Sequence, residues 1–184
     1  TGAMEAAVGN LHSPGDTAIY VNGGKFGERW GELLKAYGVN AVEIRVEWGD
    51  AVRAEQMVEV VKKNPKAKGI YLTHSETSTG VATDVKEIAS VVRSHSDAAI
   101  VVDGITAVGA MELRMDDWGI DVVVTGSQKG LMIPPGLAFL TASKRAWSMI
   151  GASKLPKYYF DLNLARKALD SSDTPWTPAI SLIV

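Results

Sequence analysis

Hydrophobic residues along the chain follow two spacings, one typical of helices and one typical of buried strands. Between Phe26 and Tyr37 the apolar residues recur at helical spacing, and Gly38 follows as a helix stop. Elsewhere, short runs are apolar at nearly every position, which is typical of strands buried on both faces. The pattern predicts helices over 3–10, 26–37, 51–62, 85–92 and 144–150, and strands over 17–21, 41–46, 69–73, 98–102, 121–125 and 136–140.

This alternation of strands and helices predicts an α/β fold. Strands that are apolar on both faces need a helix layer on each side, so we expect a three-layer sandwich with a mostly parallel central sheet. Residues 74–80 are expected to form a polar loop, and 170–178 a long loop rich in Ser, Thr and Pro.

Composition removes several classes of function. The 184 residues suit one domain, and 19 Lys and Arg against 21 Asp and Glu give a net charge of -2, which argues against a nucleic-acid partner. The absence of cysteine excludes a disulfide scaffold and a cysteine nucleophile, and three dispersed histidines argue against a zinc site, so no metal is expected. No apolar run reaches the ~20 residues of a membrane span, and no signal pattern opens the chain. The expected location is therefore the cytoplasm, without a membrane partner.

The two ends of the chain suggest a piece of a longer protein. The chain begins directly in the first predicted helix and stops within the apolar run 179–184, without a Gly, Asn or Pro stop signal. The alternative is that 180–184 docks as a terminal strand or helix.

Polar side chains follow several of the predicted strands, where α/β sheets bind their ligands. Asp103 comes directly after the apolar run 98–102, and Lys129 follows one strand–helix–strand unit later. A buried carboxylate without a partner is costly, so Asp103 needs a cation or a hydrogen-bond donor. A plain ion pair between Asp103 and Lys129 would satisfy this need as well as a catalytic site would.

Further motifs favour a catalytic site over a plain ion pair between Asp103 and Lys129. The stretch Thr-Gly-Ser-Gln-Lys-Gly-Leu at 125–131, followed by Pro-Pro-Gly at 134–136, resembles the pyridoxal-phosphate lysine motif of class V aminotransferases, which are fold-type I enzymes. The loop Thr-His-Ser-Glu-Thr-Ser-Thr-Gly-Val at 73–81 is similar to the same family, and so are 1–7, 23–30 and 102–103, in the same order. The resemblance covers essentially the whole chain and is nearest to the alanine–glyoxylate and serine–glyoxylate aminotransferases.

The resemblance assigns the chemistry of pyridoxal phosphate (PLP) to two residues. Lys129 would form the Schiff base with the cofactor aldehyde and later move a proton, which arginine is too basic to do. Asp103 would hold a proton on the pyridine nitrogen, and such a pair at ~4 Å is worth roughly 4 kcal/mol at an effective dielectric of about 20. That energy is enough to keep the ring cationic at neutral pH.

The resemblance also implies a set of cofactor contacts. The small residues at a helix start would bind the phosphate through backbone N–H groups, with a side-chain donor from Gln128. Thr77 would bind the ring hydroxyl, and Phe26 would stack on the ring, although core packing alone would also explain Phe26. His74 is expected to be structural or to support a residue that contacts the cofactor. The remaining implied contacts are Thr1, Gly2 and Ala3 at the phosphate, and Thr174 and Thr177 in a loop that reaches the neighbouring subunit's phosphate.

In family terms, 1–184 corresponds to the PLP-binding large domain, truncated at both ends and without the small C-terminal domain that grips the substrate carboxylate. The resemblance implies transfer of an amino group from alanine or serine to glyoxylate or pyruvate, by a homodimer with a shared active site.

Several alternatives are weighed against this function. A dehydrogenase needs G-x-G-x-x-G, which the Gly-rich stretch 21–27 does not match, and a nucleotide triphosphatase motif is missing. A cysteine desulfurase of the same superfamily needs a cysteine and usually carries His where this chain has Gln128. Another fold-type I PLP enzyme, of lyase type, stays open as an alternative. A folded cofactor-binding fragment without activity of its own stays open.

Overall fold

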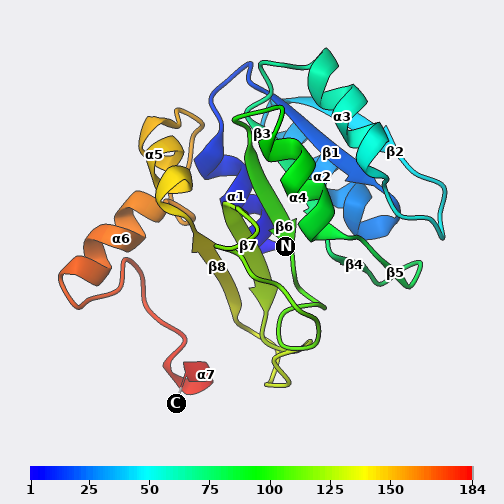
Figure 1. The fold of residues 1–184 in the computed structure, drawn as a ribbon. Helices are drawn as coiled ribbons and strands as arrows, with labels where there is room; N and C mark the ends of the chain where they lie inside the picture. Colours follow the sequence, from blue (N-terminus) through cyan, green and yellow to red (C-terminus); the bar gives the residue numbers. More distant parts are fainter. Residues whose placement is uncertain (184) are drawn as a thin grey trace.

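A six-stranded sheet with strand order β2-β1-β3-β6-β7-β8 forms the centre of the computed structural model, which describes residues 1–183 (Figure 1). The first five strands in this order are parallel, and β8 alone pairs antiparallel, with β7. The expected mostly parallel α/β sheet is thereby confirmed. The strands are β1 (Thr17–Asn22), β2 (Asn40–Arg45), β3 (Gly69–Thr73), β6 (Ala99–Asp103), β7 (Val122–Gly126) and β8 (Ala138–Ala142), with a separate hairpin of β4 (Ser75–Glu76) and β5 (Val81–Ala82).

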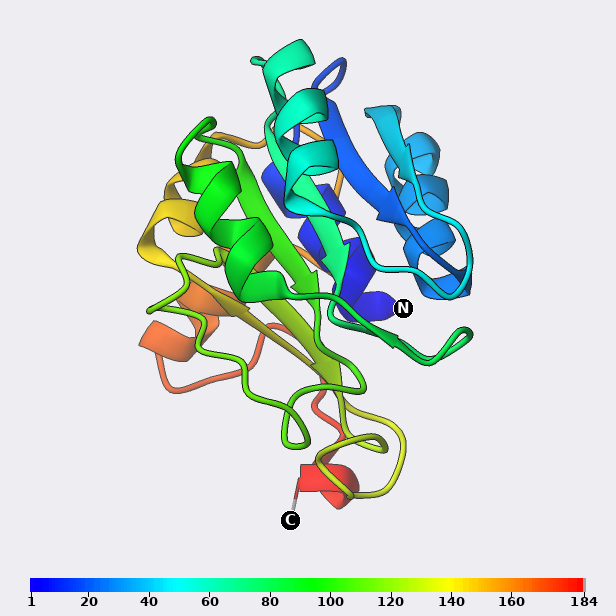
Figure 2. The same cartoon turned by 45° about the vertical axis from the view of Figure 1, so that its right-hand side comes forward.

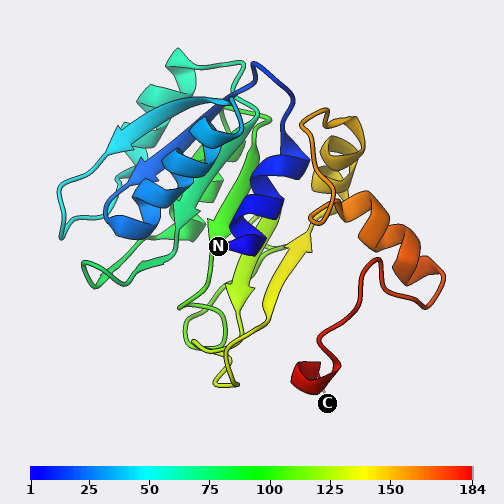
Figure 3. The ribbon, with the colours of Figure 1, turned by 180° about the vertical axis from the view of Figure 1, so that it is seen from behind.

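Helices cover both faces of the sheet. One face packs against α1, α2 and α5, and Figure 3 shows α1 and α2 in front of the strands; the opposite face packs against α3 and α4. Neighbouring strand residues point to opposite faces, so Val122 and Val124 join the core cluster of the first face while Val123 joins that of the second. The helices are α1 (Gly2–Leu11), α2 (Lys25–Ala36), α3 (Ala54–Lys63), α4 (Val85–Arg93), α5 (Lys144–Ala152), α6 (Leu162–Asp170) and α7 (Ile180–Ile183).

The structure differs from the sequence prediction at the far edge of the sheet. The last strand lies at Ala138–Ala142 instead of 136–140, because its bounds follow its antiparallel register with β7 and not the limits of the apolar run 137–140. Helix α6 is missing from the sequence prediction, although Leu162, Ala165 and Leu169 recur at helical spacing; none of its residues is fully buried, and Leu162 packs against the core cluster of the first face. Residues 180–183 form the short exposed helix α7, while Val184 lies outside the described residues.

The polar segment 74–80 is more ordered than the expected loop. It contains β4 and turns into β5, and the N–H of Gly80 closes the turn on the carbonyl of Glu76 at 2.8 Å. Gly80 has φ of 74°, a left-handed conformation that favours glycine.

None of the helices described over residues 1–183 is long and apolar enough to cross a membrane.

Candidate active site

The carboxyl edge of β3, β6 and β7 brings several sequence-predicted site residues together. Asp103 ends β6, and its register partners are Thr73 of β3 and Val124 of β7. Lys129 lies three positions beyond the end of β7 at Gly126. Figure 2 shows the start of α1 and the β4–β5 hairpin at this same edge. Parallel strands therefore place the carboxyl and the amine on neighbouring strand ends, as expected.

Asp103 is a buried acid, with an exposed fraction of 3%. Its Oδ1 accepts a hydrogen bond of 2.8 Å from the N–H of Ile105, and no cationic side chain among residues 1–183 forms an ion pair with it. Burial raises the pKa of Asp103 to about 6, against the hydrogen bond from Ile105, and the negative charge of Glu76 raises it further. The predicted plain ion pair with Lys129 is absent from the described chain. Asp103 is therefore suited to a cationic partner that the described chain does not supply.

The loop that carries Lys129 is fixed by its own backbone. Buried Ser127 exchanges hydrogen bonds with Leu137, its N–H donating to the carbonyl at 3.0 Å and its Oγ accepting from the N–H at 3.3 Å. A Cβ on Gly130 would lie 2.2 Å from the carbonyl oxygen of Val108, so the loop packs backbone against backbone on the segment that follows Asp103. Lys129 itself is exposed. The lysine therefore stands on a rigid loop that is held against the segment following β6.

The β4–β5 hairpin holds Thr77 beside the start of α2. Glu76, with an exposed fraction of 5%, accepts hydrogen bonds from the N–H groups of Phe26 at 3.1 Å and Gly27 at 2.9 Å. The Oγ of Ser78 accepts from the N–H of Lys25 at 2.9 Å. The first turn of α2 is thus capped by side chains about fifty residues away in sequence, and exposed Thr77 stands between them.

Phe26 is half-buried at the start of α2 and does not belong to either core cluster. The guanidinium of Arg29 lies 5.0 Å from the centre of its ring, a cation–π contact. Arg29 also lowers the pKa of Asp103, although less than burial raises it. The core-packing explanation of Phe26 is therefore the weaker one, because the ring borders a charged side chain instead of the core.

A cavity of about 530 Å³ lies between the start of α1, β8 and the segment 159–179. Gly2 and Ala3, expected at this chain's phosphate, line it, and so do Thr174 and Thr177, which the resemblance assigns to the neighbouring subunit's phosphate. Thr1 precedes α1 and makes no side-chain cap on it. Asp103, Gln128 and Lys129 are not among the described residues that line this cavity, and Gln128 is exposed beside Ser127.

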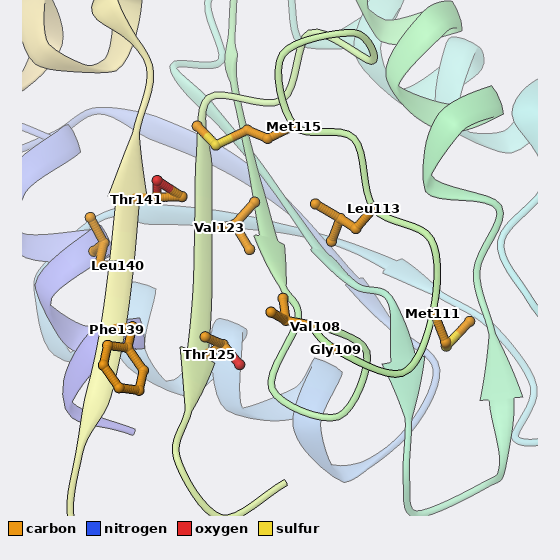
Figure 4. A pocket seen from close by; sticks show the side chains of 10 residues that line it. All are labelled: Val108, Gly109, Met111, Leu113, Met115, Val123, Thr125, Phe139, Leu140 and Thr141. Carbon is orange, nitrogen blue, oxygen red and sulfur yellow. The ribbon is translucent and has the colours of Figure 1, made fainter. Parts of the chain in front are cut away.

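A second cavity, of about 310 Å³, lies on β7 and β8, next to the α3–α4 core cluster (Figure 4). Its lining is apolar apart from two threonines and includes no charged side chain, so it lacks the groups that a phosphate or a pyridine nitrogen needs. The residues around it are Val108, Gly109, Met111, Leu113, Met115, Val123, Thr125, Phe139, Leu140 and Thr141.

His74 is buried, and its backbone N–H donates to the carbonyl of Asp103 at 3.0 Å. Burial lowers the pKa of its ring, partly offset by the charge of Asp84. These contacts agree with the expected structural role.

Sequence reasoning missed Glu76, Ser78, Arg29 and Gly130. All four lie inside the motifs that carry the family resemblance, so their positions in those motifs could have marked them as candidate site residues. Their partners lie far away in sequence, and spacing along the chain does not reveal such contacts.

The fold, together with the residues at the carboxyl edge of the sheet, agrees with one protein family. The model of the aminotransferase class-V family matches residues 1–158, and the chain belongs to that family of PLP-dependent enzymes.

Individual relatives support the same conclusion. The chain is 46% identical to the soluble hydrogenase 42 kDa subunit of Anabaena cylindrica, over 100% of this chain and 49% of that protein. It is 34% identical to the L-aspartate–glyoxylate aminotransferase of Paracoccus denitrificans, over 100% of this chain and 47% of that protein. The crystal structure of the alanine–glyoxylate aminotransferase from Nostoc sp. superposes with a TM-score of 0.91 at 30% identity, over 98% of this chain and 48% of that one. The expected family and branch are confirmed, and the chain spans about half the length of the curated relatives it matches.

Proposed function

We propose that this chain is the cofactor-binding part of an aminotransferase, with Lys129 as the residue that binds PLP covalently. The observation that carries the proposal is Asp103, a buried acid beside the Lys129 loop without a cationic partner in the described chain. The protein would move an amino group from a small amino acid to a 2-oxo acid such as glyoxylate or pyruvate.

The residues present fit the cofactor at its ring. A protonated pyridine nitrogen would supply the positive charge that Asp103 lacks, and its binding would relieve the cost of a buried carboxylate. Phe26 would pack on the ring with Arg29 beside it, and the hydroxyl of Thr77 would bind the ring hydroxyl.

The phosphate would bind at the start of α1. This ten-residue helix has no side-chain cap, so its first N–H groups are available to an anion, and Gly2 and Ala3 allow a close approach. Thr174 and Thr177 line the same cavity, and in the proposed dimer their hydroxyls would donate to the phosphate of the neighbouring subunit. Thr1 would add its N–H or hydroxyl at the cap position, and Gln128 a side-chain amide.

When bound, PLP acts as an electron sink for the substrate carbon. The chain supplies the rest: Asp103 keeps the ring nitrogen protonated, and Lys129 Nζ carries a proton to and from the substrate carbon.

The amino donor and acceptor follow from the relatives alone. Two of the reported relatives are named for alanine and for L-aspartate with glyoxylate, whereas the Anabaena cylindrica relative is named as a hydrogenase subunit; the two aminotransferases support a small amino acid and a 2-oxo acid as the proposed substrates. A homodimer with a shared active site, in the cytoplasm, completes the proposal. Sedimentation of the protein with and without PLP tests the dimer, and a monomer under both conditions would contradict it.

Titration with PLP tests the cofactor assignment. We expect a visible absorption band that saturates and is lost in a Lys129→Ala protein. The matched control is Lys144→Ala, because exposed Lys144 follows β8 and lies at the amino edge of the sheet. A band of equal strength in the Lys129→Ala protein would refute the assignment.

A second candidate is a cofactor-binding unit without turnover of its own. It is favoured by the chain spanning about half the length of its relatives. Assay of this chain with alanine, serine or aspartate plus glyoxylate separates the two, since turnover would exclude the inert unit.

A further inference from the structure

Helix α2, which begins at Lys25, has no N-cap side chain of its own. Three other helices carry a local cap: Asp84 for α4, Ser143 for α5 and Asp161 for α6 each accept a bond from a backbone N–H two or three positions on. At the same place before α2 stands Gly24, which has no side chain. The orphan N–H groups of α2 therefore need partners from another element.

Glu76 takes the position that a local cap would occupy. A Cβ on Gly24 would lie 2.5 Å from Cγ and Cδ of Glu76 and 2.5 Å from Oγ of Ser78. The backbone of Gly24 is extended, a conformation that any residue can adopt. Glycine is needed here because a side chain would not fit, and not because of the backbone angles. The carboxylate of Glu76 thus fills the space that the missing side chain of Gly24 leaves beside the helix start.

The same carboxylate also shapes the hairpin. Its Oε1 accepts from the N–H of Ser78 at 3.2 Å and from the Oγ of Ser78 at 2.6 Å, which folds the chain around Thr77. The hairpin is joined to the loop after β6 as well, because the hydroxyl of Thr106 donates to the carbonyl of Ser75 at 3.0 Å. Glu76 therefore links the elements that carry Phe26 and Thr77, next to the segment after Asp103.

We propose that Glu76 is a positioning residue, which caps α2 from the β4–β5 hairpin and so fixes Phe26 and Thr77 relative to each other around the PLP ring. This inference rests on the proposed function. A cap formed within α2 would stabilise the helix equally well but would leave the hairpin free to move.

Two readouts test the role. The first is amide hydrogen exchange of Phe26, Gly27 and Ser78 without cofactor. In Glu76→Gln and Glu76→Ala proteins we expect it to be faster by at least about fivefold, the effect of a lost cap. The second is the dissociation constant for PLP from the visible band, which we expect to rise at least about tenfold in Glu76→Ala. Exposed Glu59, paired with Lys63 on α3, gives the control Glu59→Gln, which should change neither.

A triple variant separates positioning from simple helix stability. Glu76→Ala and Ser78→Ala together remove the side-chain atoms that a Cβ on Gly24 would meet, so adding Gly24→Asp to this pair restores a local cap and the net charge, and Glu76→Ala with Ser78→Ala is its matched control. We expect amide protection of α2 and the melting temperature to recover, while PLP affinity stays low because the hairpin is no longer tied to the helix.

Recovery of PLP affinity together with amide protection would overturn the proposal, since Glu76 would then be only a cap. Wild-type affinity in Glu76→Ala would overturn it too. If the unmodified chain binds no PLP, the proposed function fails and the positioning role with it, whereas the amide exchange still decides whether Glu76 caps α2.

Discussion

The buried carboxyl of Asp103 lowers the stability of the unloaded protein at neutral pH. Its folded-state pKa of about 6 lies above the ordinary value of 3.8, so the folded protein holds this proton more tightly than the unfolded chain does. The stability that the protonated carboxyl provides is therefore fully present below pH 3.8 and is lost as pH rises through about 6. An asparagine is neutral at every pH and keeps an oxygen for the N–H of Ile105. Asp103→Asn should therefore raise the free energy of unfolding by about 3 kcal/mol near pH 8.

Urea unfolding with and without the substitution measures this gain, which should vanish near pH 4. A gain that is equal at both pH values would show that the charge of Asp103 is not its cause. The same variant should bind PLP more weakly. The carboxylate of Asp103 would then lower the stability of the protein while strengthening the binding of the cofactor.

His12 works in the opposite direction over the same pH range. Its ring is fully buried, Nε2 is 2.7 Å from the hydroxyl of Tyr71, and burial lowers its pKa to about 4 against the charge of Asp16. The unfolded chain takes up a proton near pH 6.5 while the folded chain stays neutral, so stability falls by about 3 kcal/mol as pH drops from 6.5 to 4. The stability of a His12→Gln protein should lack this fall, measured by urea unfolding across the range. An unchanged pH slope in the variant would contradict the account.

At the scale of elements, Gly130 joins the Lys129 loop to the segment after β6. A side chain there would meet the carbonyl oxygen of Val108 at 2.2 Å, and a backbone atom cannot move away cheaply. Gly130→Ala should cost about 2 kcal/mol of stability and weaken PLP binding. The control is Gly151→Ala in α5, where no atom lies within 4 Å and alanine should stabilise the helix by about 0.5 kcal/mol. Thermal unfolding and the PLP titration measure both, and normal PLP affinity in Gly130→Ala would contradict the role of this contact.

The amino edge of the sheet is held by an ion cluster instead. Asp121 is buried before β7 and accepts bonds from Arg93, from Arg145 at 2.7 Å and from Ser143 at 2.9 Å. Burial acts to raise the pKa of Asp121, but the hydrogen bonds from Arg145 and the N–H of Ile100 outweigh it, and the pKa is lowered.

Asp121→Ala should destabilise the protein by about 3 kcal/mol, because two partly buried guanidinium groups lose their anion. Arg145→Ala should cost less, because Arg93 still neutralises the acid. Denaturant unfolding ranks the two, and an equal cost would contradict the shared role. PLP affinity should stay normal in both, since the cluster lies at the opposite edge from Lys129.

The elements that the sequence predicts well are those buried on both faces. β3, β6 and β7 follow from apolar runs, because helix layers on both sides leave no polar positions. β8 is placed two residues too early because its bounds are set by its register with β7, which the apolar run 137–140 does not reveal, and α6 is missed although its apolar residues recur at helical spacing.

Across the whole molecule, the order of the motifs along the chain is enough to predict that Asp103 and Lys129 lie on neighbouring strand ends. Parallel strands share one carboxyl edge, so sequence order suffices for this step. The tie from Glu76 to α2 and the fit of Gly130 against Val108 do not follow from the sequence, because both join segments far apart in it and depend on side-chain and backbone packing.

The central claim is that one amine of this chain bonds to PLP. Borohydride reduction of the protein with PLP, followed by peptide mass spectrometry, tests it most directly. The account predicts a stable adduct on Lys129 alone, formed in proportion to the visible band. A reduced adduct spread over exposed lysines, or located on any lysine other than Lys129, would contradict it.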